Sequence, residues 1–316
     1  MNGITLLSTG KALPQKCVTN NDMAAIVETS DEWISSRTGI STRYFCQEQE
    51  QSWQLAAKAA KEAVEKANIS VEEIGLCIVA TMSPPFATPS VACLVQRELE
   101  LPSDTLCFDL NAACTGFVYT LETARALLAT NEKPYGLLIG CESLSRIVDF
   151  SDRNTCVLFG DGAAAVVVKR SNSQFFAMHG AKGNDKALVC PGYGAEKQYL
   201  TMDGKAVFRF AVESIPHCIN EILNASSLTL EDIDYIVCHQ ANRRIIDSVI
   251  RQMKAPAEKF YMNLQHYGNT SAASIPLALA DMQQQNLLRP GAKLLCVGFG
   301  GGFTWGASLV CWKEKE

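Results

Sequence analysis

The sequence repeats its own pattern of predicted elements after about half its length. Residues 230–238 have the pattern of residues 71–79, in which an apolar residue and two acidic residues precede a short apolar run. Residues 294–297, followed by glycines, likewise match residues 137–140. The copies lie roughly 145–160 residues apart, a spacing far longer than the unit of a solenoid. A chain of this kind is therefore expected to fold as two similar halves.

Both halves alternate apolar strands with helices. Residues 74–80 form a continuous apolar run, which is typical of a strand buried on both faces. Residues 53–67 are rich in Ala, Lys and Glu, which favours a helix. This alternation indicates an α/β protein with mostly parallel strands. We expect the halves to be residues 1–170 and 171–316, and only the glycine-rich residues 177–198 have no clear pattern.

Composition excludes several classes of protein. Hydrophobic residues make up 47% and charged residues 19% of the 316 residues, which favours a large core over disorder. The net charge of −5 gives no reason to expect nucleic-acid binding. Thirteen cysteines without a CxxC pair fit a reducing cytoplasm better than a disulfide scaffold or a zinc site. We expect neither a secretion signal nor a membrane span, because the first ten residues have no basic region and no apolar run approaches about 18 residues.

Cys114 stands between a predicted strand and a predicted helix. One face of that helix carries four apolar residues, Phe117, Leu121, Ala124 and Leu128. Free backbone N–H groups in a first helical turn favour a thiolate by up to about 2 kcal/mol. An unpaired cysteine is more often a small buried apolar residue. Its position leads us to the hypothesis that Cys114 is a nucleophile that carries an acyl group as a thioester.

The second half carries polar residues at corresponding places. His239 follows the predicted strand 235–238, and Asn269 lies at a strand-to-helix junction. Active groups of α/β sheets collect beyond the C-terminal ends of strands, although a lone His is often structural and an isolated Asn often caps a helix. The glycine-dense residues 298–306 form either a tight reversal or a set of backbone N–H donors for an oxyanion. No helix follows these glycines, so they do not form a dinucleotide-binding fingerprint.

Taken in order, the motifs around these residues resemble the β-ketoacyl-acyl-carrier-protein synthase III family, the condensing enzymes that start fatty-acid synthesis. The matching segments run from about residue 29 to residue 310 and keep the family's order. They are Asp-Glu-Trp33-Ile-x-x-Arg37-Thr-Gly-Ile, Asn-Ala-Ala-Cys114-Thr-Gly-Phe, Asp-Arg153-x-Thr, Phe-Gly-Asp-Gly-Ala, His239-Gln-Ala-Asn242-x-Arg244-Ile, Gly-Asn269-Thr-Ser-Ala-Ala-Ser and Phe299-Gly-Gly301-Gly-Phe-Thr-Trp-Gly. The resemblance implies an α/β thiolase-like fold, two similar βα halves packed as αβαβα layers, and a homodimer.

The resemblance also implies an acyltransferase reaction. An acyl-CoA primer and malonyl-acyl carrier protein (malonyl-ACP) would give 3-oxoacyl-ACP and CO2 by decarboxylative Claisen condensation, with no metal and no permanently bound cofactor. Cys114 would take the acyl group, while His239 and Asn269 would hold the thioester carbonyl oxygen of the malonyl group. The N–H groups of Cys114 and Gly301 would form a second oxyanion hole. Phe299 would lie beside the nucleophile.

Binding residues follow from the same resemblance. Trp33 and Arg153 would sandwich the adenine of CoA, with Arg37 near its phosphates. The remaining CoA contacts would come from Thr38 and Asn242. Docking of the acidic carrier protein would use one basic helix face, made of Arg244, Arg251 and Lys254, although for Lys254 a solvated face is as good an interpretation. Thr88 falls near the position that closes the acyl pocket across the dimer interface, so we expect a pocket deeper than acetyl alone requires.

Other enzymes with a catalytic cysteine fit the sequence less well. A thiolase needs a second cysteine in the C-terminal glycine loop, and residues 299–303 contain none. Elongating ketosynthases use a second histidine where this chain has Asn269. Papain-like hydrolases use Cys, His and Asn but do not have a duplicated α/β chain, and a non-catalytic relative is expected to lose one of these residues. The remaining alternative is a relative from secondary metabolism that acylates a different acceptor through Cys114.

Overall fold

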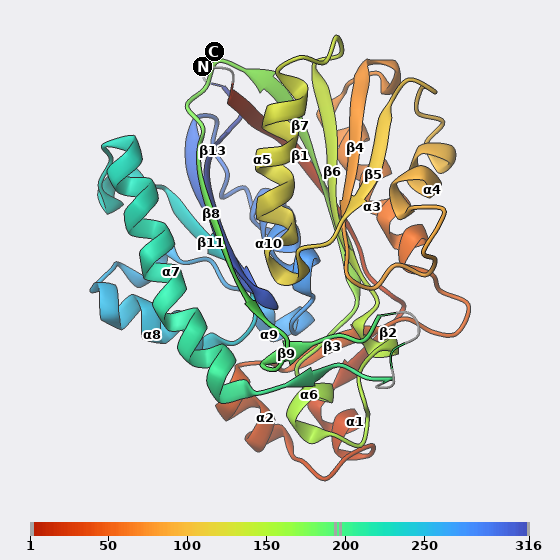
Figure 1. The fold of residues 1–316 in the computed structure, drawn as a ribbon, viewed down its shortest axis with the longest axis vertical. Helices are drawn as coiled ribbons and strands as arrows, with labels where there is room; N and C mark the ends of the chain where they lie inside the picture. Colours follow the sequence, from red (N-terminus) through yellow and green to blue (C-terminus); the bar gives the residue numbers. More distant parts are fainter. Residues whose placement is uncertain (1–2, 193–194, 196–197, 315–316) are drawn as a thin grey trace.

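A nine-stranded mixed sheet forms the centre of the molecule (Figure 1). The computed structural model describes residues 3–192, 195 and 198–314. The strands are ordered β11-β12-β13-β1-β7-β6-β4-β5, and β8 pairs with β13. Their bounds are β1 Gly3–Ala12, β4 Ile74–Ala80, β5 Leu106–Leu110, β6 Tyr135–Glu142, β7 Gly162–Ser171, β8 Phe176–Asn184, β11 Tyr235–Cys238, β12 Ala292–Gly300 and β13 Gly302–Trp312.

The strand pairing confirms the two similar halves. In the first half β7 is antiparallel to β1 and β6, and β4 is parallel to β6 and β5. In the second half β13 is antiparallel to β8 and β12, and β11 is parallel to β12. The prediction of mostly parallel strands is wrong, because a turn rather than a crossover helix leads into β13 and returns it antiparallel to β12. The boundary between residues 170 and 171 stays a prediction.

Helices complete the five predicted layers, αβαβα. Helices α5 (Gly116–Leu128) and α10 (Ser274–Gln284) lie between the two halves of the sheet (Figure 1). Helices α3 (Ser52–Ala67) and α4 (Val91–Glu98) cover one outer face, while α7 (Gly204–Ser226) and α8 (Arg243–Met253) cover the other. Strand β4 is buried on both faces as predicted, because Leu76 packs in the middle layer and Cys77 against the outer helices.

Two local predictions differ from the structure. Residues 177–198 contain most of β8, whose alternating exposure is that of a sheet edge; residues 193, 194, 196 and 197 of that range lie outside the described part. The apolar residues at 4–9, followed by Gly10 and Pro14, predict a short strand, and the observed β1 extends beyond that range at both ends. The short elements are β2 Lys16–Thr19, β3 Thr42–Phe45, β9 Leu188–Val189, β10 Thr201–Met202, α1 Asn20–Ala24, α2 Asp31–Thr38, α6 Arg153–Cys156 and α9 Leu264–Tyr267.

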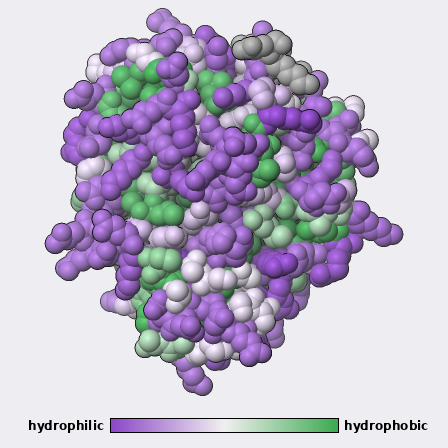
Figure 2. Space-filling view, turned by 180° about the vertical axis from the view of Figure 1, so that it is seen from behind, coloured by the Kyte–Doolittle hydropathy of each residue, from purple (hydrophilic) through white to green (hydrophobic). Residues whose placement is uncertain are grey.

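Hydrophilic side chains cover most of the face opposite to that of Figure 1, with small separate hydrophobic patches between them (Figure 2). Among the described residues no helix has both the length and the apolar character that crossing a membrane requires. Twelve of the thirteen cysteines, all but Cys311, are free thiols.

Candidate active site

Cys114 lies on a tight turn between β5 and α5. The turn is the short helix Ala113–Thr115, and Ala113 has a φ of 47°, in the left-handed region. Cys114 is buried, with only 5% of the residue exposed. The backbone of Gly300 passes beside it, so closely that a Cβ on residue 300 would lie 2.8 Å from the Cβ of Cys114. Only glycine therefore fits at position 300 without displacing the thiol.

The resting thiol is neutral. Burial raises the pKa of Cys114 to about 12, the hydroxyl of Ser271 lowers it, and the nearby carboxylate of Glu142 raises it further. The backbone N–H of the first helical turn does act in the predicted direction. Its effect is smaller than that of desolvation, so the pKa of the Cys114 thiol is raised overall.

His239 follows β11 and is 1% exposed. Its Nδ1 lies 2.7 Å from the hydroxyl oxygen of Ser274, and that oxygen accepts the backbone N–H of Gln240 at 3.3 Å. The hydroxyl can then donate its own hydrogen to Nδ1, which leaves the imidazole proton on Nε2. Burial lowers the pKa of His239 to about 3. The ring is therefore a neutral hydrogen-bond donor.

Asn269 comes from a turn that repeats the turn of Cys114. Its Oδ1 accepts the backbone N–H of Ser271 at 2.9 Å, as the Oδ1 of Asn111 accepts the N–H of Ala113 at 3.2 Å. Ser271 and Ala113 both have positive φ angles, of 48° and 47°. Since its oxygen is engaged, the carboxamide of Asn269 is oriented to donate through its NH2 group.

One cavity of about 500 Å³ joins these three groups to the surface. Cys114, His239 and Asn269 all line it, as the sequence predicted. Phe299 lines it too, and its ring centroid is 5.1 Å from that of His239. The cavity can hold an elongated ligand whose reacting end meets a thiol and two hydrogen-bond donors.

The predicted CoA residues gather at the outer part of this cavity, where Trp33, Arg37, Thr38 and Asn242 line it. The guanidinium carbons of Arg37 and Arg153 lie 4.7 and 4.8 Å from the ring centroid of Trp33. The two cations therefore occupy the faces of the indole, and a stacked base requires one of them to move.

A second cavity, of about 400 Å³, also reaches Cys114. Gly301 lines it, and part of its wall consists of apolar side chains that the sequence did not single out: Met82, Leu188, Cys190, Pro191 and Leu200. Thr88 is exposed and is not among the residues that line either cavity of its own chain. Its predicted role depends on a second subunit and stays a prediction.

Glu142 is a buried carboxyl near Cys114 that the sequence analysis missed. It ends β6, accepts the hydroxyl of Ser83 at 2.5 Å and the N–H of Met82 at 3.2 Å, and is fully buried. Burial raises its pKa to about 7. The rule that pointed to His239, a polar residue directly after a buried strand, applies equally to Glu142.

The predicted docking face lies on α8. Arg244 and Arg251 are exposed on this helix, and Lys254, also exposed, is the residue that caps its C-terminal end. Asn242 caps the start of the helix by accepting the N–H of Arg244 at 2.8 Å. Within the described part of the chain, no three His, Cys, Asp or Glu side chains are arranged to hold a metal ion.

Comparison with known proteins places these features in a family. The models for 3-oxoacyl-[acyl-carrier-protein] synthase III and for its C-terminal part match residues 108–183 and 223–312. The chain is 47% identical to a β-ketoacyl-[acyl-carrier-protein] synthase III of Clostridium acetobutylicum, over 99% of this chain and all of the relative. The crystal structure of the Aquifex aeolicus 3-oxoacyl-[acyl-carrier-protein] synthase III has a TM-score of 0.92 at 41% identity, covering 98% of this chain and all of that one. A priming β-ketosynthase of the R1128 polyketide pathway has a TM-score of 0.93 at 30% identity, covering 99% and 97%.

Proposed function

The chain belongs to the 3-oxoacyl-[acyl-carrier-protein] synthase III family, and on that premise we propose that Cys114, His239 and Asn269 carry out its reaction. The enzyme is an acyltransferase that condenses an acyl-CoA primer with malonyl-ACP at the start of fatty-acid synthesis. The convergence of these three side chains in one cavity is the observation that carries the proposal.

Acyl transfer to Cys114 is the first step. The sulfur attacks the acyl-CoA carbonyl, the bond from that carbon to the CoA sulfur breaks, and CoA leaves as a thiol that carries the proton Cys114 has lost. The tetrahedral oxyanion is held by the backbone N–H groups of Cys114 and Gly301. The close approach of Gly300 to Cys114 brings the glycine turn beside the nucleophile and supports this assignment.

Decarboxylation of malonyl-ACP is the second step. The bond to the carboxylate breaks, CO2 leaves, and the electron pair moves toward the thioester oxygen. Nε2–H of His239 and the carboxamide NH2 of Asn269 donate to that oxygen, and one such donor is typically worth about 3 kcal/mol. The resulting carbanion attacks the acyl-Cys114 carbonyl, and the Cys114 sulfur leaves to give 3-oxoacyl-ACP.

Intact-mass measurement after incubation with acyl-CoA tests the nucleophile. Wild type is expected to gain the mass of one acyl group, and Cys114→Ser to gain none. Cys93→Ser is the matched control, since Cys93 is an exposed thiol on the outer helix α4. Acylation of Cys114→Ser at the wild-type rate would reject the assignment.

The two half-reactions separate the other roles. Asn269→Ala is expected to accept the acyl group normally but to release CO2 from malonyl-ACP about 100-fold more slowly, the loss expected for one oxyanion donor. An equal loss of both half-reactions would instead indicate that Asn269 mainly supports the fold.

The second cavity is proposed as the site of the acyl chain. Its volume of about 400 Å³ compares with about 30 Å³ for one water in the liquid, so it offers far more room than an acetyl methyl needs. We expect C4–C8 or branched primers to acylate Cys114 at least as well as acetyl-CoA. A panel of acyl-CoAs scored by intact mass tests this, and a strong preference for acetyl-CoA would contradict it.

The exposed cations of α8 are proposed as the carrier-protein site. Arg251→Glu is expected to raise the KM for malonyl-ACP about tenfold while leaving the KM for acyl-CoA unchanged, because long-range attraction to an acidic partner is lost. Lys61→Glu, an exposed site on α3, is the control of equal charge change. Equal effects of the two variants would indicate nonspecific attraction.

A homodimer is proposed from the edge of the sheet. Strand β5 is the last strand, and the unpaired N–H and C=O groups of an edge strand favour pairing with another chain. Leu106 on this strand is 46% exposed. Light scattering is expected to give a dimer for wild type and a monomer for Leu106→Glu. Ile26→Glu, at a site 49% exposed, is expected to stay dimeric, and a dimeric Leu106→Glu would contradict the proposal.

The rival from secondary metabolism is not favoured. The chain is more similar to the Clostridium acetobutylicum enzyme, at 47% identity, than to the polyketide-priming enzyme, at 30%. Formation of 3-oxoacyl-ACP from malonyl-ACP separates the two functions directly. We also propose a cytoplasmic location, supported by twelve free thiols, which persist in a reducing compartment.

A further inference from the structure

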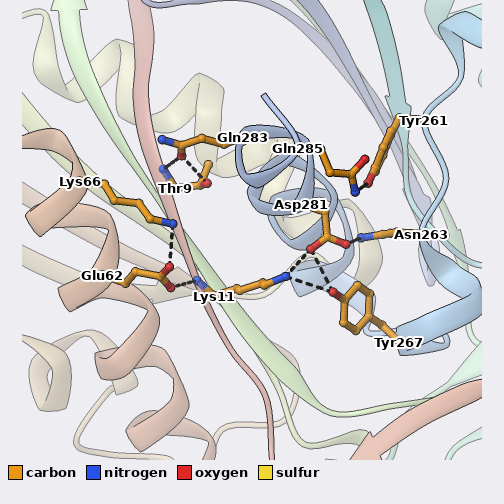
Figure 3. A network of polar contacts seen from close by, with 10 residues as sticks. All are labelled: Thr9, Lys11, Glu62, Lys66, Tyr261, Asn263, Tyr267, Asp281, Gln283 and Gln285. Atoms are coloured by element: carbon orange, nitrogen blue, oxygen red, sulfur yellow. Dashed lines mark hydrogen bonds and ion pairs between the residues drawn. The ribbon is translucent and has the colours of Figure 1, made fainter. Parts of the chain in front are cut away.

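A buried polar network is centred on Asp281 of α10 (Figure 3). The Asp281 side chain is only 8% exposed. Its carboxylate accepts from the ammonium of Lys11 at 2.5 Å, from the hydroxyl of Tyr267 at 2.9 Å and from the carboxamide of Asn263 at 2.9 Å. Three donors therefore compensate one buried charge.

One branch of the network leads to Asn269. Tyr267 is the last residue of α9, and only Gly268 separates it from Asn269. Gly268 has a φ of 66°, so the chain turns sharply directly after Tyr267. Because the hydroxyl of Tyr267 is held by Asp281, the position of Tyr267 determines the position of the Asn269 backbone, and hence of its carboxamide.

The other branch leads to His239. The backbone N–H of Asn263 donates to Oε1 of Gln240 at 3.1 Å. The Nε2 of the same Gln240 donates to the carbonyl of Cys238 at 2.8 Å. Gln240 and Cys238 are the two chain neighbours of His239, so this branch holds the backbone on both sides of the imidazole.

Helix α10, which carries Asp281, also contacts His239 directly. Ser274, in its first turn, touches Nδ1 of His239, and Asp281 follows Ser274 by seven residues, about two turns along one face. The two donors come from loops 30 residues apart in sequence, and α10 contacts both loops through polar side chains of one face.

We propose that Asp281 is a positioning residue that fixes the separation of the His239 and Asn269 donors. This inference rests on the proposed function of those two residues. It predicts that the network matters for decarboxylation, which needs both donors on one oxygen, and not for acyl transfer, which uses Cys114 and the glycine turn. A misplacement on the order of 1 Å is enough to cost about 100-fold in rate.

The test compares three full-length variants in both half-reactions. Asp281→Ala is expected to slow CO2 release from malonyl-ACP by about 10- to 100-fold and to change acylation of Cys114 by less than about twofold. Asp281→Asn keeps one acceptor for Tyr267, and rotation of the Asn263 carboxamide restores the second bond, so it is expected to recover most of the rate.

Gln283→Ala is the matched structural control. Gln283 lies on the same helix and accepts two hydrogen bonds from Thr9 of β1 at 2.7 Å. Among the described residues, it makes no hydrogen bond to the loops that carry His239 and Asn269. It is expected to lower the melting temperature without changing the ratio of the two half-reactions. All assays are run at a temperature at which each variant is folded by circular dichroism.

The outcomes are distinct. If Asp281→Ala slows both half-reactions equally, or neither, the positioning role is overturned. If Asn269→Ala and His239→Ala, measured alongside, decarboxylate normally, the proposed function itself is overturned. Selective loss in Asp281→Ala, recovery in Asp281→Asn and an unchanged ratio in Gln283→Ala establish the inference.

Discussion

The protonation state of Cys114 in the free enzyme can be measured through its rate of alkylation. Its pKa of about 12 leaves a thiolate fraction of about 10⁻⁴ at pH 8, whereas an unperturbed thiol with a pKa near 8.5 is about one quarter ionised. The higher basicity makes each thiolate about 40 times more nucleophilic, given a Brønsted slope of about 0.45. Combining the two factors predicts that Cys114 reacts with iodoacetamide about 60-fold more slowly than an unperturbed thiol.

Peptide-resolved mass spectrometry measures this rate, with exposed Cys17 and Cys93 as internal references. Between pH 7 and pH 10 the rate for Cys114 is expected to rise about tenfold per pH unit without a plateau, because the pKa lies above this range. A plateau below pH 9, or alkylation faster than at the reference thiols, would refute the conclusion that desolvation outweighs the helix terminus.

The same measurement excludes or detects a thiolate–imidazolium pair. Moving the proton from a thiol with a pKa of about 12 to an imidazole with a pKa of about 3 costs on the order of 12 kcal/mol. The free enzyme is therefore expected to hold Cys114 and His239 both neutral, unlike a papain-like pair. Accordingly, the rate of decarboxylation is expected not to change through titration of His239 between pH 5 and pH 8. A pH-dependent change in that rate that is present in wild type and absent in His239→Gln would contradict the burial argument.

Three further predictions concern residues around the nucleophile. Ser274→Ala removes the hydrogen bond to Nδ1 of His239 and is expected to slow decarboxylation about tenfold, as a lost buried bond of about 1–3 kcal/mol implies; unchanged CO2 release would show that the tautomer does not depend on it. Glu142 has a folded pKa of about 7, above its ordinary 4.5, so its ionisation lowers stability as the pH rises from 4.5 through 7. Urea unfolding at pH 5 and pH 8 should therefore show a loss, on the order of 3 kcal/mol at most, that is absent in Glu142→Gln; equal pH dependence in both proteins would contradict it. Gly300→Ala places a Cβ 2.8 Å from the catalytic cysteine and is expected to abolish acylation, whereas Gly183→Ala, with open space at its Cβ position, is expected to be silent; an active Gly300→Ala would show that the turn can yield.

Local patterns were enough to predict much of the fold. The apolar run 74–80 is a strand, residues 53–67 are a helix and the face of Phe117 is buried, because these features depend on short-range periodicity. Strand β8 was missed because a half-exposed edge strand has neither an apolar run nor a simple alternation of residue types. The prediction of mostly parallel strands was wrong because the alternation of strands with helices does not reveal that β7 and β13 run antiparallel to their neighbours.

The site followed a similar division. Cys114, His239 and Asn269 could be named because each stands where a strand or turn leads into a helix, and the duplicated chain repeats that junction. Glu142 satisfied the same rule and was overlooked. The apolar wall of the second cavity carried no signal at all, because Met82, Leu188 and Leu200 resemble any core residues until the folded chain places them around one space.

By itself the sequence determined the duplicated architecture and the chemical identity of the reacting groups, because periodicity and side-chain chemistry are properties of short segments. Only the tertiary structure decided the charge state of those groups. Desolvation depends on how much protein surrounds a side chain, so it made Cys114 a neutral thiol and His239 a neutral donor. The support of both donor loops by Asp281 was likewise invisible in the sequence, since its partners come from segments up to 270 residues away.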